Sequence, residues 1–186
     1  DGGDGVRLTL ADFPDGEGHT LTISADDFLA MRIARGAMDA DTLAAVTEAA
    51  GRYAALRAAI RMLGAGQCSR RRLYEKLRAR RITDADATFA VDTVYAKGYI
   101  DEDWQLRSYI RTLTAQKQYG PRKLYAALAA KGYRGDDIRR AMDENFGAEE
   151  IRAARRVFLE KKFGKTAPET RDEAAAMRQA LYKQGF

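Results

Sequence analysis

Near the start of the chain, hydrophobic residues alternate with polar ones on both sides of a segment rich in turn-forming residues. The alternating positions are Val6, Leu8, Leu10, Leu21 and Ile23, and the segment between them contains Pro14-Asp15-Gly16-Glu17-Gly18. This pattern predicts a β-hairpin closed by a short loop. Because an isolated hairpin is marginally stable in water, we expect it to pack against another element.

A short helix is predicted directly after the hairpin. Ser24 followed by Asp27 has the spacing of a helix N-terminus, Phe28, Leu29 and Ile33 supply apolar residues, and Gly36 is a typical stop. We expect this helix to support the hairpin.

From residue 41 onward the hydrophobic spacing becomes helical. The positions recur every three or four residues, as Leu43, Val46, Tyr53, Leu56, Ile60 and Leu63, and Gly64-Ala65-Gly66 ends the run. Gly51 lies inside the run, so the sequence is compatible with one kinked helix or with two short ones.

The same hydrophobic register occurs three times along the chain, at successive offsets of 51 and 53 residues. Its members are Leu73, Leu77 and Ile82, then Leu124, Leu128 and Tyr133, then Met177, Leu181 and Phe186. Around the first two copies, caps and glycines divide the sequence into three helices, and around the third into two. In the first copy Ser69 and Thr83 begin the second and third helices, in the second copy Gly120-Pro121 opens the second helix, and in the third copy Thr170 with Glu173 forms a capping box.

We therefore predict a mainly α fold of tandem three-helix repeats, preceded by the β-hairpin and short helices. The expected segments are residues 1–52 for the hairpin and short helices, 53–100 for the first repeat, 101–150 for the second and 151–186 for the third, in which the third helix is missing. Since a unit of this size buries little alone, stacked repeats should form an elongated, curved array.

Charge divides the chain into an acidic head and a basic body. Residues 1–52 hold 4 Lys or Arg and 10 Asp or Glu, whereas residues 53–186 hold 28 and 17. The excess on the body points to a polyanionic partner. One Cys and one His exclude an intrachain disulfide and a His/Cys zinc site, and charged residues interrupt every apolar run, which excludes a membrane span. The start of the chain has no signal-peptide pattern and is expected to be a flexible leader, which favours the cytoplasm.

The densest basic cluster lies on the predicted second helix of the first repeat. It comprises Arg70, Arg71, Arg72, Lys76, Arg78, Arg80 and Arg81. Arg72, Lys76 and Arg80 form a stripe with four-residue spacing, in which like charges repel by about 0.2–0.5 kcal/mol per pair. A polyanion would relieve this repulsion, whereas an ordinary solvated face would leave it in place.

The basic excess recurs in the second repeat. Arg122 and Lys123 occupy the positions of Arg71 and Arg72, and Arg107 and Arg111 occupy those of Arg57 and Arg61; the third repeat has Ala175 and Ala176 instead of the first pair. We expect the first two repeats to carry most of the contact with an acidic partner.

Other candidate chemistry is sparse. The aromatic residues have helical spacing that favours core packing over base stacking, and Cys68 before the Ser69 cap is expected to be structural. His19 has no evident partner. We find no phosphate-binding loop, no nucleophile with a base and no carboxylate pair, so neither catalysis nor a cofactor or metal is expected.

An ordered set of short motifs resembles the RecX family, bacterial regulators of the RecA recombinase. The motifs are residues 68–77 (CSRRRLYEKL), 97–102 (KGYIDE), 109–111 (YIR), 119–124 (YGPRKL), 161–164 (KKFG) and 184–186 (QGF). The resemblance covers residues 53–186, and Arg72 departs from it, because an acidic capping residue is common at that position.

The resemblance implies a curved array of three-helix repeats that binds in the groove of the RecA–DNA filament and represses strand exchange, ATP hydrolysis and coprotease activity in DNA repair and the SOS response. The basic positions that match are Arg70, Arg71, Arg72, Lys76, Arg107, Arg111, Arg122 and Lys123. The alternatives are a module that binds single- or double-stranded DNA directly, or an architectural protein, and a helical scaffold without a nucleic-acid partner.

Overall fold

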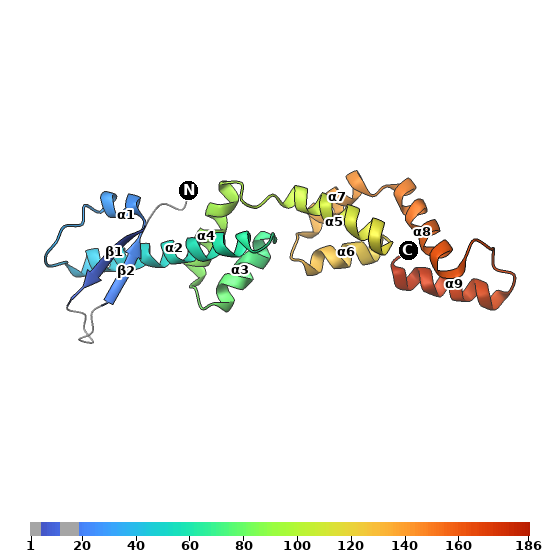
Figure 1. The fold of residues 1–186 in the computed structure, drawn as a ribbon, viewed down its shortest axis with the longest axis horizontal. Coiled ribbons are helices and arrows are strands. Elements are labelled where there is room, and N and C mark those ends of the chain that lie inside the picture. Colours follow the sequence, from blue (N-terminus) through green and yellow to red (C-terminus); the bar gives the residue numbers. More distant parts are fainter. Residues whose placement is uncertain (1–4, 12–18) are drawn as a thin grey trace. The chain divides into compact units, whose positions relative to one another are not determined.

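The computed structural model describes residues 5–11 and 19–186, which form a small hairpin followed by helices (Figure 1). The predicted leader at residues 1–4 and the turn at residues 14–18 lie outside the described residues. The elements are β1 (Val6–Leu10), β2 (His19–Ile23), α1 (Ala25–Ala30), α2 (Ala40–Gly64), α3 (Arg70–Ala79), α4 (Asp84–Ala96), α5 (Glu102–Lys117), α6 (Pro121–Ala130), α7 (Gly135–Asn145), α8 (Ala148–Phe163) and α9 (Arg171–Gln184). The predicted fold class, mainly α with an N-terminal hairpin, is confirmed.

Contacts divide the chain into two compact units. The first contains residues 1–68 and 72–100, and the second contains residues 69–71 and 101–186. The predicted division into four segments stays a prediction, although its boundary after residue 52 falls inside α2, which is one continuous helix. Gly51 does not break this helix. A side chain there would meet the Asp86 carboxylate at 2.8 Å, so its small size permits the close approach of α4.

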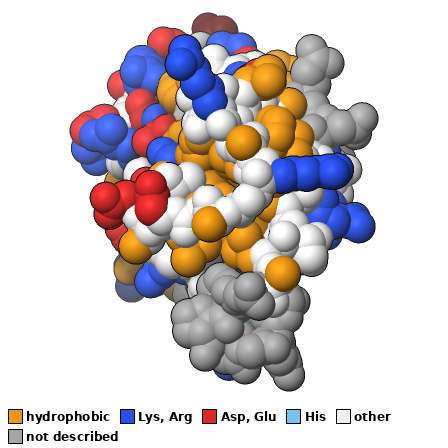
Figure 2. Space-filling view, turned by 90° about the vertical axis from the view of Figure 1, so that its left-hand side faces the viewer, with side chains coloured by type: hydrophobic (Ala, Val, Ile, Leu, Met, Phe, Trp, Pro, Cys, Tyr) orange, Lys and Arg blue, Asp and Glu red, His pale blue; other side chains and the backbone are white. Residues whose placement is uncertain are grey.

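The hairpin packs on the first half of α2. β1 and β2 are antiparallel, with Val6 opposite Ile23 and Leu8 opposite Leu21, so these residues share one face. Ile23 of this face forms a small core with Val46, Ala49 and Ala50 of α2, and Val6, Leu8 and Leu21 pack against that core. Figure 2 looks at this end of the first unit and shows apolar side chains gathered there, with Lys and Arg at the edges of the face.

The short helix differs in part from the prediction. Ser24 caps it as expected, because its hydroxyl accepts a hydrogen bond from the Asp27 N–H at 3.0 Å. The helix ends at Ala30 rather than near Gly36, and Leu29 is 70% exposed while Phe28 packs on the hairpin core. His19 is the first residue of β2 and lies opposite Leu10.

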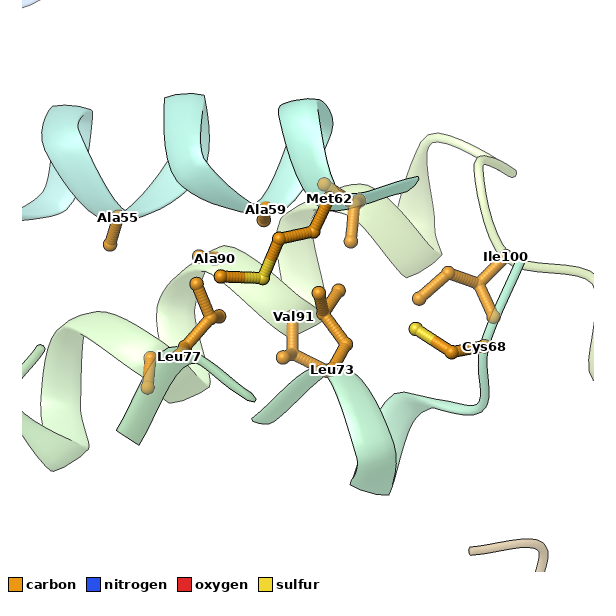
Figure 3. Close-up of a cluster of buried hydrophobic side chains, with 11 residues drawn as sticks. Ala55, Ala59, Met62, Cys68, Leu73, Leu77, Ala90, Val91 and Ile100 are labelled. Carbon is orange, nitrogen blue, oxygen red and sulfur yellow. The ribbon is translucent and has the colours of Figure 1, made fainter. Parts of the chain in front are cut away.

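The second half of α2 packs with α3 and α4 around a separate core (Figure 3). Leu73 and Leu77 of α3 are fully buried against small residues of α2, Ala55 and Ala59, and against Val91 of α4. The predicted α2 residues Leu56, Ile60 and Leu63 border this core and are only partly buried. Tyr95 of α4 is 44% exposed, because Ala90, Val91 and Val94 fill the face that points inward.

In the second unit α5, α6 and α7 repeat this packing. Leu124 and Leu128 of α6 are fully buried, as are Leu73 and Leu77 at the equivalent positions of α3, and they contact Leu106, Ile110 and Ile138. The predicted hydrophobic register is therefore confirmed for these two copies. α8 and α9 follow, with the predicted Thr170–Glu173 capping box at the start of α9.

Candidate functional site

The basic residues of α3 are exposed because its leucines face the core. With Leu73 and Leu77 buried four residues apart, the helix turns its other positions toward solvent. Arg71, Arg72, Lys76, Arg78, Arg80 and Arg81 are all exposed. Helix packing thus presents most of the predicted cluster on the surface of the first unit.

Three cations of this unit surround one open hollow of about 510 Å³. Arg61 lies in the last turn of α2, Lys76 lies in the last turn of α3, and Arg80 directly follows α3. Met62, Ala65 and Ala79 complete the lining. Two of the lining residues are alanines, whose side chains are short. Among the residues that the structure describes, no acidic side chain lines the hollow. We call this the α2–α3 hollow, and it has the charge and size to receive an anionic group.

Arg61 was not among the residues that the sequence singled out for binding. Its signal was the repeat itself, because Arg111 of α5 occupies the equivalent position at an offset of 50. Arg107 and Arg111 are exposed on α5, since the neighbouring Leu106 and Ile110 are turned into the core of the second unit.

Cys68 lies close to Lys76 but is a buried core residue (Figure 3), in contact with the cluster that contains Ile100. Burial raises the pKa of its thiol, and the nearby Lys76 and Arg72 oppose this rise only in part. The thiol is therefore neutral at physiological pH. This supports the structural role that the sequence indicated for it.

Arg78 and Arg81 shape the end of α3. A guanidinium N–H of Arg78 donates to the Ile82 carbonyl at 2.6 Å, and the Ile82 N–H donates to the Leu77 carbonyl at 3.4 Å. Arg81 has φ of +63°, a left-handed conformation, and Gly132 and Gly185 have φ of +89° and +95° at the equivalent repeat positions. The first repeat therefore uses an arginine where the other two use glycine.

Replacing Arg81 with glycine should stabilise the first unit by about 0.5–1 kcal/mol, because glycine adopts the left-handed conformation without steric cost. The increase would be seen in the free energy of unfolding measured by urea titration. Arg80→Gly is the control, because residue 80 is not left-handed; it should destabilise the unit. A loss of stability in Arg81→Gly would contradict this account of the turn.

Arg70 and Arg72 have partners within the chain. The Arg70 backbone N–H donates to one Glu102 carboxylate oxygen at 2.8 Å and its Nε donates to the other at 3.0 Å; the two side chains are 33% and 13% exposed. Glu102 thus satisfies a donor in the first turn of α3. Arg72 pairs with Glu75 at 3.0 Å on the exposed surface, where such a pair contributes little.

Arg122 and Lys123 hold the end of α9. Arg122 donates to the Phe186 carbonyl at 2.9 Å, and its guanidinium carbon lies 4.2 Å from the centroid of the Tyr182 ring. Lys123 donates to the Gln184 side-chain oxygen at 3.2 Å and lies near the Tyr119 ring. The structure therefore gives these two residues a role within the second unit.

Other classes of site find no support in the structure. Within residues 5–11 and 19–186, no group of His, Cys, Asp or Glu side chains is placed to hold a metal ion. The helices of the described chain are all too short or too polar to span a bilayer. The exposed basic residues of α3 and α5 remain the candidate site on the described surface.

Several known proteins are similar to this chain in sequence. No family model matches the chain. The regulatory protein RecX of Geobacillus thermodenitrificans is 26% identical over 167 residues, which cover 89% of this chain and 62% of that protein, so the chain spans about three-fifths of this relative. The regulatory protein RecX of Thermus thermophilus is 34% identical over 102 residues, which cover 55% of this chain and 70% of that protein.

Solved structures agree on the fold. A crystal structure of a regulatory protein RecX superposes with a TM-score of 0.74, at 18% identity, over 98% of this chain and 94% of that one. The crystal structure of RecX from Lactobacillus salivarius gives 0.64, also at 18% identity, over 73% and 88%. With the repeats, the caps and the match to the Thermus protein, these findings show that the chain belongs to the RecX family of regulatory proteins.

Proposed function

We propose that the chain binds RecA–DNA filaments in the cytoplasm and inhibits the recombinase, ATPase and coprotease activities that they support in DNA repair and the SOS response. Membership of the RecX family supports a regulatory role. The observation that carries the proposal is the α2–α3 hollow, where Arg61, Lys76 and Arg80 meet without an acidic residue in the lining. A filament formed on DNA presents the polyanion that such a surface needs.

Electrostatics explains why the hollow would matter for binding. The three cations lie on one unit, so they can meet one acidic surface together and steer the approach of the filament. They also repel one another, and a phosphate or carboxylate between them would remove that repulsion. Arg71, Arg107 and Arg111 are exposed and are further candidates for contact. Arg70, Arg122 and Lys123 are engaged by Glu102 and by the end of α9.

The test is a titration of RecA ATPase activity on single-stranded DNA. The wild-type chain should inhibit at substoichiometric concentrations, and Lys76→Gln/Arg80→Gln should need roughly five- to ten-fold more protein, because two charged contacts are lost. Arg35→Gln/Lys97→Gln removes two exposed charges elsewhere on the first unit and is the matched control. It should inhibit like the wild type.

Two results would count against the proposal. If the wild type at molar excess leaves ATP hydrolysis unchanged, the chain is not a RecA inhibitor. If the two double variants inhibit equally well, the α2–α3 hollow is not the contact, and the inhibitory surface lies elsewhere.

Direct binding of DNA is a second candidate, because the α2–α3 hollow would also accept a phosphate of naked DNA. Sequence-specific recognition is disfavoured, since the exposed residues of α6 include Ala126, Ala129 and Ala130, which cannot read base edges. If three phosphates of a duplex are neutralised, the logarithm of the binding constant should fall with the logarithm of salt concentration with a slope of about −2.7. Fluorescence anisotropy with a labelled duplex measures this slope, and no binding at low salt would remove the candidate.

A further inference from the structure

A second hollow lies in the second unit, between α8, the linker that follows it, and α9. It encloses about 420 Å³, and we call it the α8–α9 hollow. Four of its lining residues are cations and one, Glu160, is acidic. The cations are Arg152, Arg155, Arg156 and Lys165. None of them belongs to the basic positions considered above, so this charge is not used by the proposed filament contact.

The sequence of α8 brings these arginines to one side. Positions 152, 155, 156 and 159 are spaced as i, i+3, i+4 and i+7, so three arginines and Leu159 share one helical face. Core packing uses a neighbouring face of α8, where Ala154 is buried and Ile151 is partly buried. Gly164, with φ of +85°, ends the helix and turns the linker, and Thr166, Ala167 and Pro168 then line the same hollow.

The arginines of this face are weakly neutralised. Arg152 lies 3.9 Å from Glu149, and both side chains are largely exposed, 71% and 88%, so the pair contributes little. Arg155 and Arg156 are adjacent and exposed on the same turn. Arg152 lies three and four residues before them, and like charges at this spacing repel. An anionic ligand would relieve this repulsion and would be attracted by three guanidinium groups and one ammonium group together.

The apolar part of the lining distinguishes the class of ligand. The apolar lining residues of the hollow are Leu159, Ala167, Pro168 and Met177. Within the described part of the chain, no aromatic ring lines the hollow. Nucleic-acid bases therefore have no ring on which to stack. An aliphatic side chain, in contrast, can pack on Leu159 and Met177 while flanking carboxylates reach the arginines, which form charge-assisted hydrogen bonds with planar carboxylates.

We propose that the α8–α9 hollow binds an acidic peptide segment of a partner protein, one that carries an aliphatic side chain between carboxylates. Its residues are separate from the α2–α3 hollow, and the proposal needs neither DNA nor a filament. A chain with both hollows would hold an extended anionic partner through one surface and an acidic protein segment through the other.

The experiment is fluorescence anisotropy with the full chain and a labelled peptide of alternating Glu and Leu at low salt. Three unlabelled competitors define the ligand: a Gln–Leu peptide removes the charge, a Glu–Ser peptide removes the aliphatic side chains, and an oligothymidylate of equal charge supplies phosphates. Unlabelled Glu–Leu peptide, added as a reference competitor, should compete better than all three. Arg155→Gln/Arg156→Gln should weaken its binding by about five-fold or more, because two charge-assisted contacts are lost.

Arg178→Gln/Lys183→Gln is the matched control, since it removes two exposed charges from α9 that do not line the hollow. It should change the dissociation constant less than about two-fold. Circular dichroism melts of both variants are to be recorded as well, to check that each variant is folded. Equal weakening by the two variants, better competition by the oligothymidylate, or no binding of the Glu–Leu peptide would each overturn the proposal. Because the assay contains no RecA, its failure leaves the ATPase test of the proposed function unaffected.

Discussion

Replacing Gly185 with alanine should weaken the attachment of α9 to α6 by about 2–4 kcal/mol. Two costs add at this residue. Its φ of +95° is left-handed, which disfavours alanine, and the new Cβ would lie 2.5 Å from the backbone nitrogen of Lys123. Backbone atoms cannot move aside like a flexible side chain, so α9 would have to shift away from α6.

The shift would break a dense set of contacts. The Gly120 N–H donates to the Gln184 carbonyl at 2.9 Å, and the Arg122 N–H donates to the Gly185 carbonyl at 3.1 Å. Gly120 makes no side-chain cap for α6, so the end of α9 provides the acceptors that its first N–H groups need. The positive N-terminus of one helix thereby meets the negative C-terminus of the other.

Two other glycines separate the two costs. Gly120→Ala has an ordinary φ of −75° but would place Cβ 2.4 Å from the Gly185 carbonyl carbon, so it tests the clash alone. Gly98→Ala has a left-handed φ of +72° with open space around it, so its free energy of unfolding, measured on the first unit, should fall by the conformational cost alone, about 1–2 kcal/mol. Hydrogen exchange of the α9 amides measures the attachment. It should accelerate in the Gly185 and Gly120 variants and not in Gly98→Ala, and unchanged exchange in all three would refute the close packing of these helices.

This contact explains two of the motifs that carried the family resemblance. Tyr-Gly-Pro at residues 119–121 and Gln-Gly-Phe at residues 184–186 are the two sides of one junction. The same pair of repeat positions meets again within the second unit, where the Ser69 hydroxyl donates to the Lys131 carbonyl at 2.7 Å. Ser69 and Gly120 are 51 residues apart, and Lys131 and Gln184 are 53 apart, as the hydrophobic register requires. The repeat therefore specifies a recurring contact as well as a fold.

Sequence alone could predict the features that depend on local spacing. Leucines four residues apart on a helix share a face, so burial of Leu73, Leu77, Leu124 and Leu128 follows from the pattern, and the caps at Ser24, Thr83 and Thr170 follow from short-range hydrogen bonding. The length of α1 was harder to predict, because Ile33 packs on the hairpin core from outside the helix and so imitates helical spacing.

The role of each cation could not be predicted from local pattern. Arg122 and Lys123 match Arg71 and Arg72 in register. They nevertheless contact Phe186 and Gln184 at the end of α9, more than 60 residues further along the chain. Arg70 likewise pairs with Glu102, a residue 32 positions further along the chain, so its local sequence does not reveal the contact. The α8 arginines were not singled out from the sequence, because the α8–α9 hollow also depends on how the linker turns at Gly164.

Leu73→Ala and Leu124→Ala should each cost about 2–5 kcal/mol, the usual loss for a leucine truncated in a core. Both leucines are fully buried at equivalent repeat positions, but they belong to different hydrophobic cores and different compact units. Because the cores share no residue, we expect each variant to destabilise its own unit and to leave the other nearly unchanged.

Hydrogen exchange followed by mass spectrometry resolves the two units. A loss of about 3 kcal/mol corresponds to roughly 150-fold faster exchange of protected amides, in α2–α4 for Leu73→Ala and in α5–α7 for Leu124→Ala. Equal acceleration in both sets of helices would show that the chain unfolds as a single cooperative body. Selective acceleration would give a means to test the proposals separately, because Leu73→Ala would loosen the α2–α3 hollow while the α8–α9 hollow keeps its affinity for the acidic peptide.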